Sequence, residues 1–287
     1  MTTEQYRFLK TDPSGNTTVF VLDETKAEER SRIAQALMRE ESLAAEQVAF
    51  LDADPPRPAD FSFAMMGGEF CGNATRSAAA WLVFDRERYQ PTGQLGDKGT
   101  YEISCSGIDH NISCHVTMTS RAAFDVSADM PLPVSVSLVE AGGESLWQVI
   151  FDGITHFICP EAGRFDQEDR LALIPKILAQ YPVAHGGAEG ILFWDNPPGD
   201  PLGGNALDPY VYVKDTDTLV NESSCGSGTA ALAAALAVSL GKSVHVEASQ
   251  KGGMIYGDAA WHDGKLSSLA IGGAVHIAAE GIAYVGE

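Results

Sequence analysis

Two stretches of this chain, far apart in the sequence, are nearly the same. Residues 71–82 read CGNATRSAAAWL and residues 225–236 read CGSGTAALAAAL, so half of the aligned positions are identical, including both cysteines. Each stretch places a cysteine and a small, glycine-containing turn directly before an alanine-rich run that predicts a helix. The repeat favours a duplicated fold in which each half carries one cysteine at the start of a helix.

The start of a helix gives these cysteines a defined electrostatic setting. The first backbone N–H groups of a helix have no partner inside the helix, and the N-terminus is the positive end of the helix dipole. Such an end lowers the pKa of a thiol and also binds a carboxylate. The two repeats therefore predict two thiols, one on each side of an anionic substrate.

The pattern of apolar residues predicts a chain of many strands and four helices. The helices are expected at 26–39, from the first cysteine turn to about 84, at 167–180 despite Pro175, and from the second cysteine turn to 240. The strands are expected at 6–9, 17–22, 47–51, 61–65, 101–104, 112–118, 134–139, 147–151, 155–158, 191–194, 210–213, 243–247, 254–258, 266–271 and 276–285. The segment 197–205 is expected to be an irregular Pro/Gly loop.

The two central helices set the fold class. Residues 77–84 and 229–240 are almost all apolar or small, and a helix without a polar face is buried on all sides. In a chain rich in strands, a curved sheet is the natural cover. We therefore predict an α+β fold of two pseudo-symmetric halves, each a curved β-sheet wrapped around a central buried helix. Residues 1–124, completed by a C-terminal strand at 275–287, form the first half, 125–274 form the second, and the active site lies in the cleft between them.

Composition excludes several kinds of partner. The 287 residues include 39 acidic and 19 basic side chains, which gives a net charge of −20. Nucleic acids and anionic membranes attract basic surfaces, so neither is expected as a partner. No apolar run reaches the roughly 18 residues of a membrane span, and residues 1–6, MTTEQY, do not resemble a signal peptide. The expected location is the cytoplasm, and the expected partner is a small molecule.

The cysteines fit a reducing compartment. There are five, no two of them form a CxxC pair, and the seven histidines are scattered, so no metal site is expected. Cys105, Cys114 and Cys159 lie among alternating or apolar residues and are expected to be small buried core residues without chemistry. Cys71 and Cys225 remain as the reactive pair.

Two such thiols leave three kinds of chemistry open. They can form a disulfide, one of them can be a nucleophile that needs a neighbouring base, or both can exchange protons with one substrate. The third reading uses both cysteines and both helix ends. Racemisation next to a carboxylate needs a base on one face of the carbon and an acid on the other. The carboxylate would be held by the backbone N–H groups of Gly72, Asn73, Gly226, Ser227 and Gly228. This chemistry needs neither a metal nor pyridoxal phosphate, so no cofactor is expected.

These residues resemble the diaminopimelate epimerase superfamily of cofactor-independent, two-cysteine racemases. The resemblance rests on EFCGNA at 69–74 and SCGSGT at 224–229. Diaminopimelate epimerases carry a Glu-Arg-Gly-Ala-Gly-Glu segment before the second cysteine. Residues 218–224 here read TLVNESS and contain no arginine, which leaves a second substrate carboxylate without a partner.

The chain is most similar to the histidine racemase branch that serves staphylopine-type metallophore biosynthesis. The motifs are DPSGNT at 12–17, EQV at 46–48, GEFCGNAT at 68–75, SSCGSGTA at 223–230 and the pair Gly252-Gly253. The resemblance implies a homodimeric isomerase that interconverts L- and D-histidine with Cys71 and Cys225 as the acid/base pair. It also makes Asn16, Glu46 and His156 candidates for substrate contact. Asn221 and Glu222, just before Cys225, are candidates for lining the side-chain pocket.

Other functions stay open at this point. The enzyme could be a diaminopimelate epimerase or a racemase of another amino acid. A protein that binds amino acids without turnover would use the same helix ends, and a redox sensor would join Cys71 to Cys225. The sequence assigns no chemistry to Arg76, one turn into a buried helix.

Overall fold

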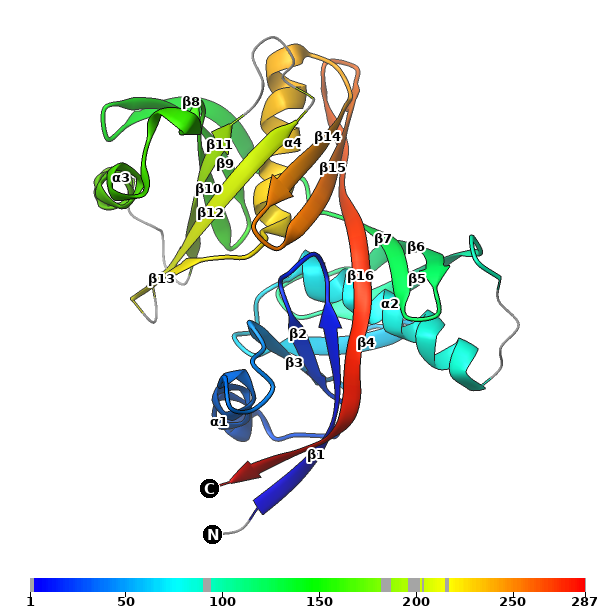
Figure 1. The fold of residues 1–287 in the computed structure, drawn as a ribbon. Helices are drawn as coiled ribbons and strands as arrows, with labels where there is room; N and C mark the ends of the chain where they lie inside the picture. Colours follow the sequence, from blue (N-terminus) through cyan, green and yellow to red (C-terminus); the bar gives the residue numbers. More distant parts are fainter. Residues whose placement is uncertain are drawn as a thin grey trace. The chain divides into compact units, whose positions relative to one another are not determined.

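The computed structural model describes residues 3–89, 94–181, 187–195, 202, 204–214 and 217–286 (Figure 1). The chain divides into two compact units, Met1–Asp129 with Gly272–Glu287, and Met130–Ile271. Both are mixtures of α-helix and β-strand in which strands predominate. In the part of the chain that is described, no helix combines the length and apolar character needed to cross a membrane.

The first unit contains two helices, α1 (Ala27–Met38) and α2 (Gly72–Tyr89). Its strands are β1 (Thr3–Asp12), β2 (Thr18–Val21), β3 (Gln47–Leu51), β4 (Phe61–Met65), β5 (Lys98–Cys105), β6 (Ile112–Ser120) and β7 (Ala123–Asp129). The later residues of β16 (Lys265–Gly286) also belong to this unit and pair antiparallel with β1, from Asp12 opposite His276 to Thr3 opposite Gly286.

The second unit contains α3 (Gln167–Gln180), α4 (Gly226–Leu240) and a 3₁₀ turn, η1 (Ala162–Arg164). Its strands are β8 (Ser135–Ala141), β9 (Glu144–Phe151), β10 (Ile154–Cys159), β11 (Ala188–Asp195), β12 (Asn205–Val213), β13 (Thr218–Asn221), β14 (Val244–Gln250), β15 (Gly253–His262) and the first residues of β16.

The two units repeat one pattern of strand pairing. In the first, β2 is parallel to β3 across α1, and β4 is parallel to β5 across α2. In the second, β10 is parallel to β11 across α3, and β12 is parallel to β14 across α4. The strands between these pairs are antiparallel in both, β3 with β4 and β11 with β12. Each repeat therefore consists of two helical crossovers, and a cysteine stands at the start of the second.

The second helix of each unit is a core helix. Helix α2 contacts β4, β5, β6 and β7, and helix α4 contacts β14 and β15 on one side and β8, β9 and β10 on another. Ten consecutive residues of α4, from Gly228 to Ala237, are buried. Their small side chains let strands approach closely: a Cβ at Gly257 of β15 would press against Ala233 and the Thr229 carbonyl. Because α4 has no polar face, it can bury its side chains against all of these strands.

Most predicted elements are present, with three corrections. Strand β7 forms at residues for which the sequence predicts no element, and in it Phe124, Val126 and Ala128 alternate inward. Strand β13 is exposed along its whole length, so it carries no apolar alternation. The strands expected at 266–271 and 276–285 are one continuous strand, β16, that passes through a glycine pair in which Gly273 has a φ of 150°. Most of the loop expected at 197–205 lies outside the described residues.

Candidate active site

Cys71 caps the start of helix α2. The backbone N–H of Ala74 donates to its Sγ at 3.4 Å. The carbonyl of Cys71 accepts from both the backbone N–H of Thr75 (3.0 Å) and the Thr75 hydroxyl (2.8 Å). The thiol thus takes the place that a serine or aspartate oxygen usually holds at a helix N-cap. The side chain is half-buried.

Cys225 makes the same contacts at helix α4. It is the N-cap residue, with φ −121° and ψ 107°, and its Sγ accepts from the backbone N–H of Gly228 at 3.4 Å. Its carbonyl accepts from the N–H (3.1 Å) and the hydroxyl (2.9 Å) of Thr229. The shared Cys-Gly-x-x-Thr pattern is therefore a capping unit, in which the threonine is as much a part of the motif as the cysteine.

A polar side chain of β3 contacts Cys71 and links it to a hydrogen-bond network. Gln47, the first residue of β3, donates from Nε2 to Asn16 Oδ1 at 2.8 Å and to Thr18 Oγ1 at 2.7 Å. Its amide also lies 3.4 Å from Cys71 Sγ, with the nitrogen able to donate to sulfur and the oxygen able to accept from the thiol. Asn16 Nδ2 donates to Glu46 Oε2 at 2.8 Å. The structure thus gathers the predicted residues Asn16 and Glu46 with Cys71.

The first turn of α2 joins the same network. Gly72 is the first residue of the helix and is buried. Asn73 Nδ2 donates to Asn16 Oδ1 at 3.2 Å, and the buried Arg76 donates from Nη2 to Asn73 Oδ1 at 2.9 Å. Gln47 and Arg76 were not among the predicted site residues. Gln47 stands in the EQV motif beside Glu46, which is the one signal that could have identified it.

Cys225 is linked to His156 through a hydroxyl. Ser227 Oγ lies 3.5 Å from Cys225 Sγ and 3.0 Å from His156 Nε2. His156, on β10, is fully buried. Burial lowers the pKa of His156 to about 3, so the imidazole is neutral at physiological pH. The predicted residues His156, Ser227 and Cys225 are thus brought together, with the serine next to the sulfur.

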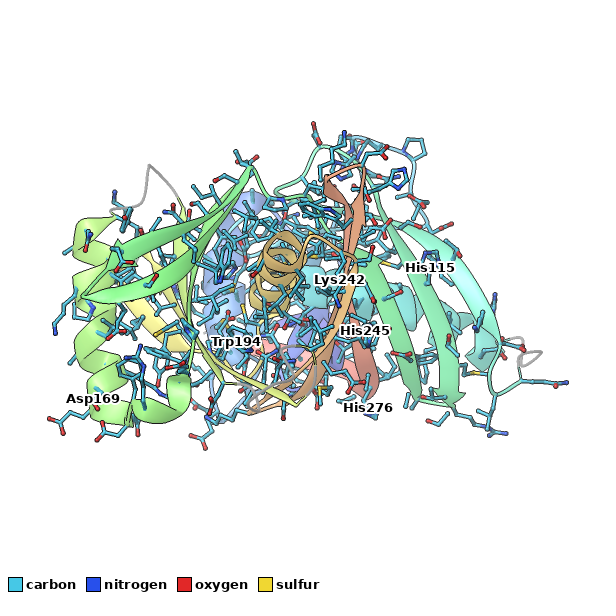
Figure 2. The ribbon with its side chains drawn as sticks, turned by 90° about the horizontal axis from the view of Figure 1, so that it is seen from above. His115, Asp169, Trp194, Lys242, His245 and His276 are labelled. Carbon is cyan, nitrogen blue, oxygen red and sulfur yellow. The ribbon has the colours of Figure 1, made fainter. Side chains whose placement is uncertain are left out.

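His156 differs from the other described histidines. His110, His115, His245, His262 and His276 are exposed, and three of them are labelled in Figure 2. His156 faces Gly190 across the parallel pair β10–β11, and a Cβ at Gly190 would overlap the imidazole ring. The glycine is therefore what leaves room for this ring.

Burial controls the protonation of Cys225. It raises the pKa of the Cys225 thiol well above its ordinary value, and the Glu222 carboxylate, which hydrogen-bonds to the thiol, raises it further. The Ser227 and Gly228 donors oppose this change. Desolvation therefore outweighs the helix end, so the expectation that the helix end lowers the thiol pKa is wrong for Cys225. Glu222 contacts Cys225 itself.

The side chain of Asn221 bonds to β12 and not to Cys225. Its Nδ2 donates to Asp208 Oδ1 at 2.8 Å and to the carbonyl of Pro209 at 3.1 Å. Asp208 in turn forms an ion pair with Arg170, with 2.7 Å between Oδ2 and Nη1. The structure thus ties Asn221 to β12, while Glu222 next to it reaches the thiol.

The backbone N–H groups of the two cysteines have different acceptors. The N–H of Cys225 donates to Gln250 Oε1 at 2.8 Å, and Gln250 Nε2 donates to Thr229 Oγ1 at 3.0 Å. The N–H of Cys71 hydrogen-bonds to the thiol of Cys105, whose pKa burial raises to about 12. Cys105, Cys114 and Cys159 are all buried, as predicted. Gln250 was not predicted, because nothing local marks a glutamine at the end of a strand.

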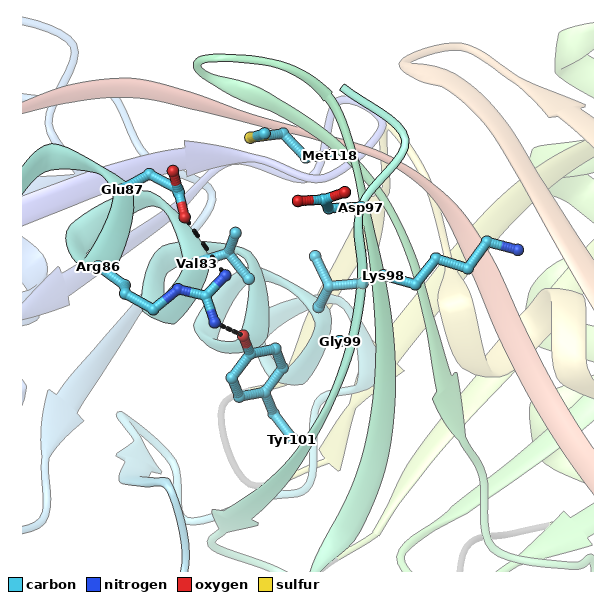
Figure 3. A pocket seen from close by; sticks show the side chains of 9 residues that line it. Val83, Arg86, Glu87, Asp97, Lys98, Gly99, Tyr101 and Met118 are labelled. Atoms are coloured by element: carbon cyan, nitrogen blue, oxygen red, sulfur yellow. Dashed lines mark hydrogen bonds and ion pairs between the residues drawn. The ribbon is translucent and has the colours of Figure 1, made fainter. Parts of the chain in front are cut away.

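Other features of the structure lie apart from these residues. A small pocket beside the C-terminal part of α2 is lined by none of the predicted site residues (Figure 3). It is bordered by Arg86, which donates to the Tyr101 hydroxyl at 3.2 Å and pairs with Glu87 at 3.4 Å. Among the described residues, no three His, Cys, Asp or Glu side chains are grouped so that they could hold a metal ion.

Comparison with known proteins identifies the family. Residues 5–284 match the family described as "Histidine racemase CntK N-terminal domain". The chain belongs to the histidine racemase family. A histidine racemase of Fusobacterium nucleatum subsp. nucleatum is 33% identical over 230 residues, 78% of this chain and 79% of that protein. A histidine racemase of Staphylococcus aureus (strain Mu50) is 26% identical over 235 residues, 81% of this chain and 80% of that protein.

Solved structures show the same fold at low sequence identity. A hydroxyproline epimerase from Agrobacterium vitis, crystallised with bound trans-4-OH-L-proline, superposes with a TM-score of 0.58 at 11% identity and covers 99% of this chain and 93% of that chain. The predicted resemblance to the histidine racemases is confirmed by the family match and by these relatives. This member of the histidine racemase family is an isomerase that acts on an amino acid.

Proposed function

We propose that this protein interconverts L- and D-histidine without a cofactor, with Cys71 and Cys225 as its acid/base pair. The observation that carries the proposal is the identical capping of two helices by the two cysteines, each with one backbone N–H on the sulfur. The histidine racemases from Fusobacterium nucleatum and Staphylococcus aureus support histidine as the substrate.

The proposed reaction is a balanced proton exchange. The thiolate of one cysteine takes the α-proton and becomes a thiol, while the thiol of the other gives a proton to the opposite face of the same carbon and becomes a thiolate. No bond other than C–H and S–H changes. The backbone N–H of Ala74 donates to Cys71 Sγ and that of Gly228 to Cys225 Sγ, so each thiolate is stabilised when it forms. The remaining N–H groups at the helix starts, on Gly72, Asn73, Gly226 and Ser227, are proposed to hold the substrate carboxylate.

The neighbouring side chains support a division of labour between the two cysteines. Burial and Glu222 favour the protonated form of Cys225. We therefore assign Cys225 as the thiol that gives its proton to the substrate carbon, while Cys71 takes the α-proton. We assign Glu46, exposed and held by Asn16, to a positively charged group of the substrate. His156 is assigned to orienting the Ser227 hydroxyl beside Cys225, since its ring is fully buried.

The wider setting is proposed on the family resemblance. We infer two halves, each a curved sheet around its buried helix, with the substrate in a cleft between them and both cysteines on one carbon. The contacts of α2 and α4 with strands of their own units support the first part of this proposal, a sheet around each helix. We further propose a cytoplasmic homodimer that supplies D-histidine for metallophore biosynthesis.

Isotope exchange tests the function directly. In D₂O, without added cofactor, L-histidine should gain α-deuterium and lose optical rotation, whereas meso-diaminopimelate should remain unchanged. Cys71→Ser and Cys225→Ser should each reduce racemisation by at least about 10²-fold, since a serine hydroxyl is a far weaker acid. Cys159→Ala, a change at a buried cysteine of β10, is the control and should keep its activity.

Two outcomes would contradict the proposal. Full activity in either active-site variant would rule out a two-base reaction. Thermal shifts with histidine but no exchange in the wild-type protein would instead indicate a binding protein.

A further inference from the structure

Arg76 occupies a place that is unfavourable for an arginine. It is fully buried, with 0% of its surface exposed, and it lies within the first five residues of α2. Burying a guanidinium costs solvation energy, and a cation near a helix N-terminus also opposes the helix dipole. Two penalties at one residue indicate that the side chain has a role that a neutral residue would not fill.

The hydrogen bond from Arg76 to Asn73 determines how the side-chain amides of Asn73 and Asn16 are oriented. A guanidinium only donates, so the atom of Asn73 that faces Nη2 at 2.9 Å must be the carbonyl oxygen. The Asn73 nitrogen is then the donor to Asn16 Oδ1 at 3.2 Å. The Asn16 nitrogen in turn donates to Glu46 Oε2 at 2.8 Å. A carboxylate only accepts, so both ends of the chain require the same orientation of the two amides.

The chain runs from the core to the surface. Arg76, Asn73 and Asn16 are 0%, 3% and 7% exposed, whereas Glu46 is exposed. A side branch reaches the thiol, because Gln47 donates to Asn16 Oδ1 and its amide also contacts Cys71. A fixed charge in the core is thereby connected to the exposed Glu46 carboxylate and, through Gln47, to Cys71.

We propose that Arg76 is a positioning residue: through Asn73 and Asn16 it orients the Glu46 carboxylate for the positively charged group of the amino-acid substrate. The inference rests on the proposed function for the identity of that substrate and for the role of Glu46. Without a donor at position 76, the Asn73 amide can turn over, and its oxygen then faces Asn16 Oδ1. The repulsion between the two oxygens acts against the remaining bond from Gln47 to Asn16 and displaces the Asn16 amide from Glu46. The result is weaker substrate binding by an enzyme whose cysteines are intact.

Three single variants, and Arg76→Met combined with Glu46→Gln, test these hydrogen bonds in the complete enzyme. Arg76→Met removes the donor and should raise KM for histidine about tenfold, equivalent to about 1.4 kcal/mol, with kcat changed less than about threefold. Arg76→Lys keeps a donor-only side chain and should stay within about threefold of the wild-type KM. Asn73→Asp keeps a partner for Arg76 but cannot donate to Asn16, so it should raise KM even if Arg76→Met does not fold. In a Glu46→Gln background, Arg76→Met should add little.

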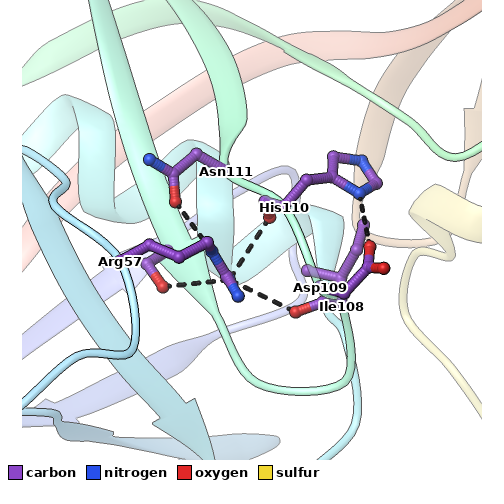
Figure 4. Close-up of polar contacts among 6 residues, drawn as sticks. Arg57, Ile108, Asp109, His110 and Asn111 are labelled. Carbon is purple, nitrogen blue, oxygen red and sulfur yellow. Dashed lines mark hydrogen bonds and ion pairs between the residues drawn. The ribbon is translucent and has the colours of Figure 1, made fainter.

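Arg57 provides the matched control. It is an arginine of the same unit that contacts none of the residues linking Arg76 to Glu46. It donates to Asn111 Oδ1 at 3.1 Å, to Ser104 Oγ at 3.2 Å and to the carbonyls of Ile108 and His110 (Figure 4). Arg57→Met should lower the melting temperature and leave KM unchanged.

A second readout does not depend on turnover. The side-chain amide signals of Asn16 and Asn73 in a ¹⁵N NMR spectrum should be protected from solvent exchange in the wild type and lose that protection in Arg76→Met, but not in Arg57→Met. Unchanged amide protection, or an unchanged KM in both Arg76→Met and Asn73→Asp, would overturn the proposal. If the wild type does not act on histidine but the amide signals change as expected, histidine is not the substrate. The hydrogen-bond chain from Arg76 to Glu46 would then still be supported.

Discussion

His156 shows how the burial of a single titratable residue affects stability. It is neutral because it is buried, it has a ring partner in Phe151 at 6.2 Å, and it depends on a glycine opposite it for space. A buried neutral histidine takes up a proton much more readily in the unfolded chain than in the folded one.

This difference predicts a loss of stability in acid. The pKa of His156 is about 3 in the folded protein, below the ordinary value of 6.5. The unfolded chain therefore binds the proton first as pH falls below 6.5, and stability declines until about pH 3. Between pH 7.5 and 5 this one group should cost about 2 kcal/mol of unfolding free energy. Urea unfolding at both pH values measures it.

His156→Gln is the reference for that measurement, since glutamine can still bond to Ser227 and does not titrate. The variant should lose less stability than the wild type over the same pH interval. Equal losses in the two proteins would show that other groups carry the acid sensitivity.

The sequence predicts the residues of the two cysteine motifs better than the residues around them. Within each motif the predicted residues are neighbours along the chain, Cys71 with Asn73 and Cys225 with Ser227, and they lie at the predicted helix starts. Gln250 reaches Cys225 only because β14 ends beside the start of α4, which depends on tertiary structure. The desolvation of Cys225 was missed for the same reason, since a pattern of residues does not reveal how many atoms surround a sulfur.

At the scale of elements, the cysteine caps are structural as well as chemical. Thr75 and Thr229 each hold the cysteine carbonyl with a hydroxyl, at 2.8 Å and 2.9 Å, in addition to the backbone bond. The second bond fixes the direction in which the chain enters the helix, and so the position of the sulfur.

Removing these hydroxyls should loosen both helix starts. Thr75→Val and Thr229→Val keep the shape of the side chain but leave the carbonyl with one donor, so each should lower the free energy of unfolding by about 1 kcal/mol. Thr75→Ser and Thr229→Ser keep the hydroxyl and serve as controls. Chemical denaturation of the four proteins is the measurement, and valine variants as stable as the wild type would show that the hydroxyl bonds contribute nothing.

Elements with a strong apolar pattern are the ones that sequence locates well. The helix expected at 167–180 is α3, Gln167–Gln180, even with Pro175 inside it, and its start is fixed by Asp166, whose side chain accepts from Asp169 N–H at 2.9 Å. Strand β13 could not be found in this way, because all four of its residues are exposed and its pairing with β12 is its structural support.

At the scale of the whole molecule, charge opposes compactness. The net charge of −20 arises from 39 acidic and 19 basic residues, and the described ion pairs, such as Arg7 with Asp23 at 2.7 Å, occupy only some of the acids. Like charges repel one another more strongly in the folded state than in the expanded one.

Salt should therefore stabilise the protein. Raising NaCl from about 10 mM to about 300 mM shortens the Debye length from about 30 Å to below 8 Å, which screens this repulsion. The melting temperature measured by calorimetry should rise by a few degrees. A neutral osmolyte at equal osmolality is the control, because it is excluded from the protein surface but does not screen charges. A melting temperature that falls with added salt would show that attractive ion pairs outweigh the repulsion.

Strand β16 has a consequence for synthesis. Its residues from His276 to Gly286 are the partners of Thr3–Asp12, so one edge of β1 stays unpaired on the ribosome until translation has passed His276. Such a late closure is slow, because it joins segments that are far apart in the sequence, and it exposes an unpaired edge to neighbouring nascent chains in the meantime. Low temperature or chaperone supply during expression should thus govern yield more than codon choice in the middle of the gene.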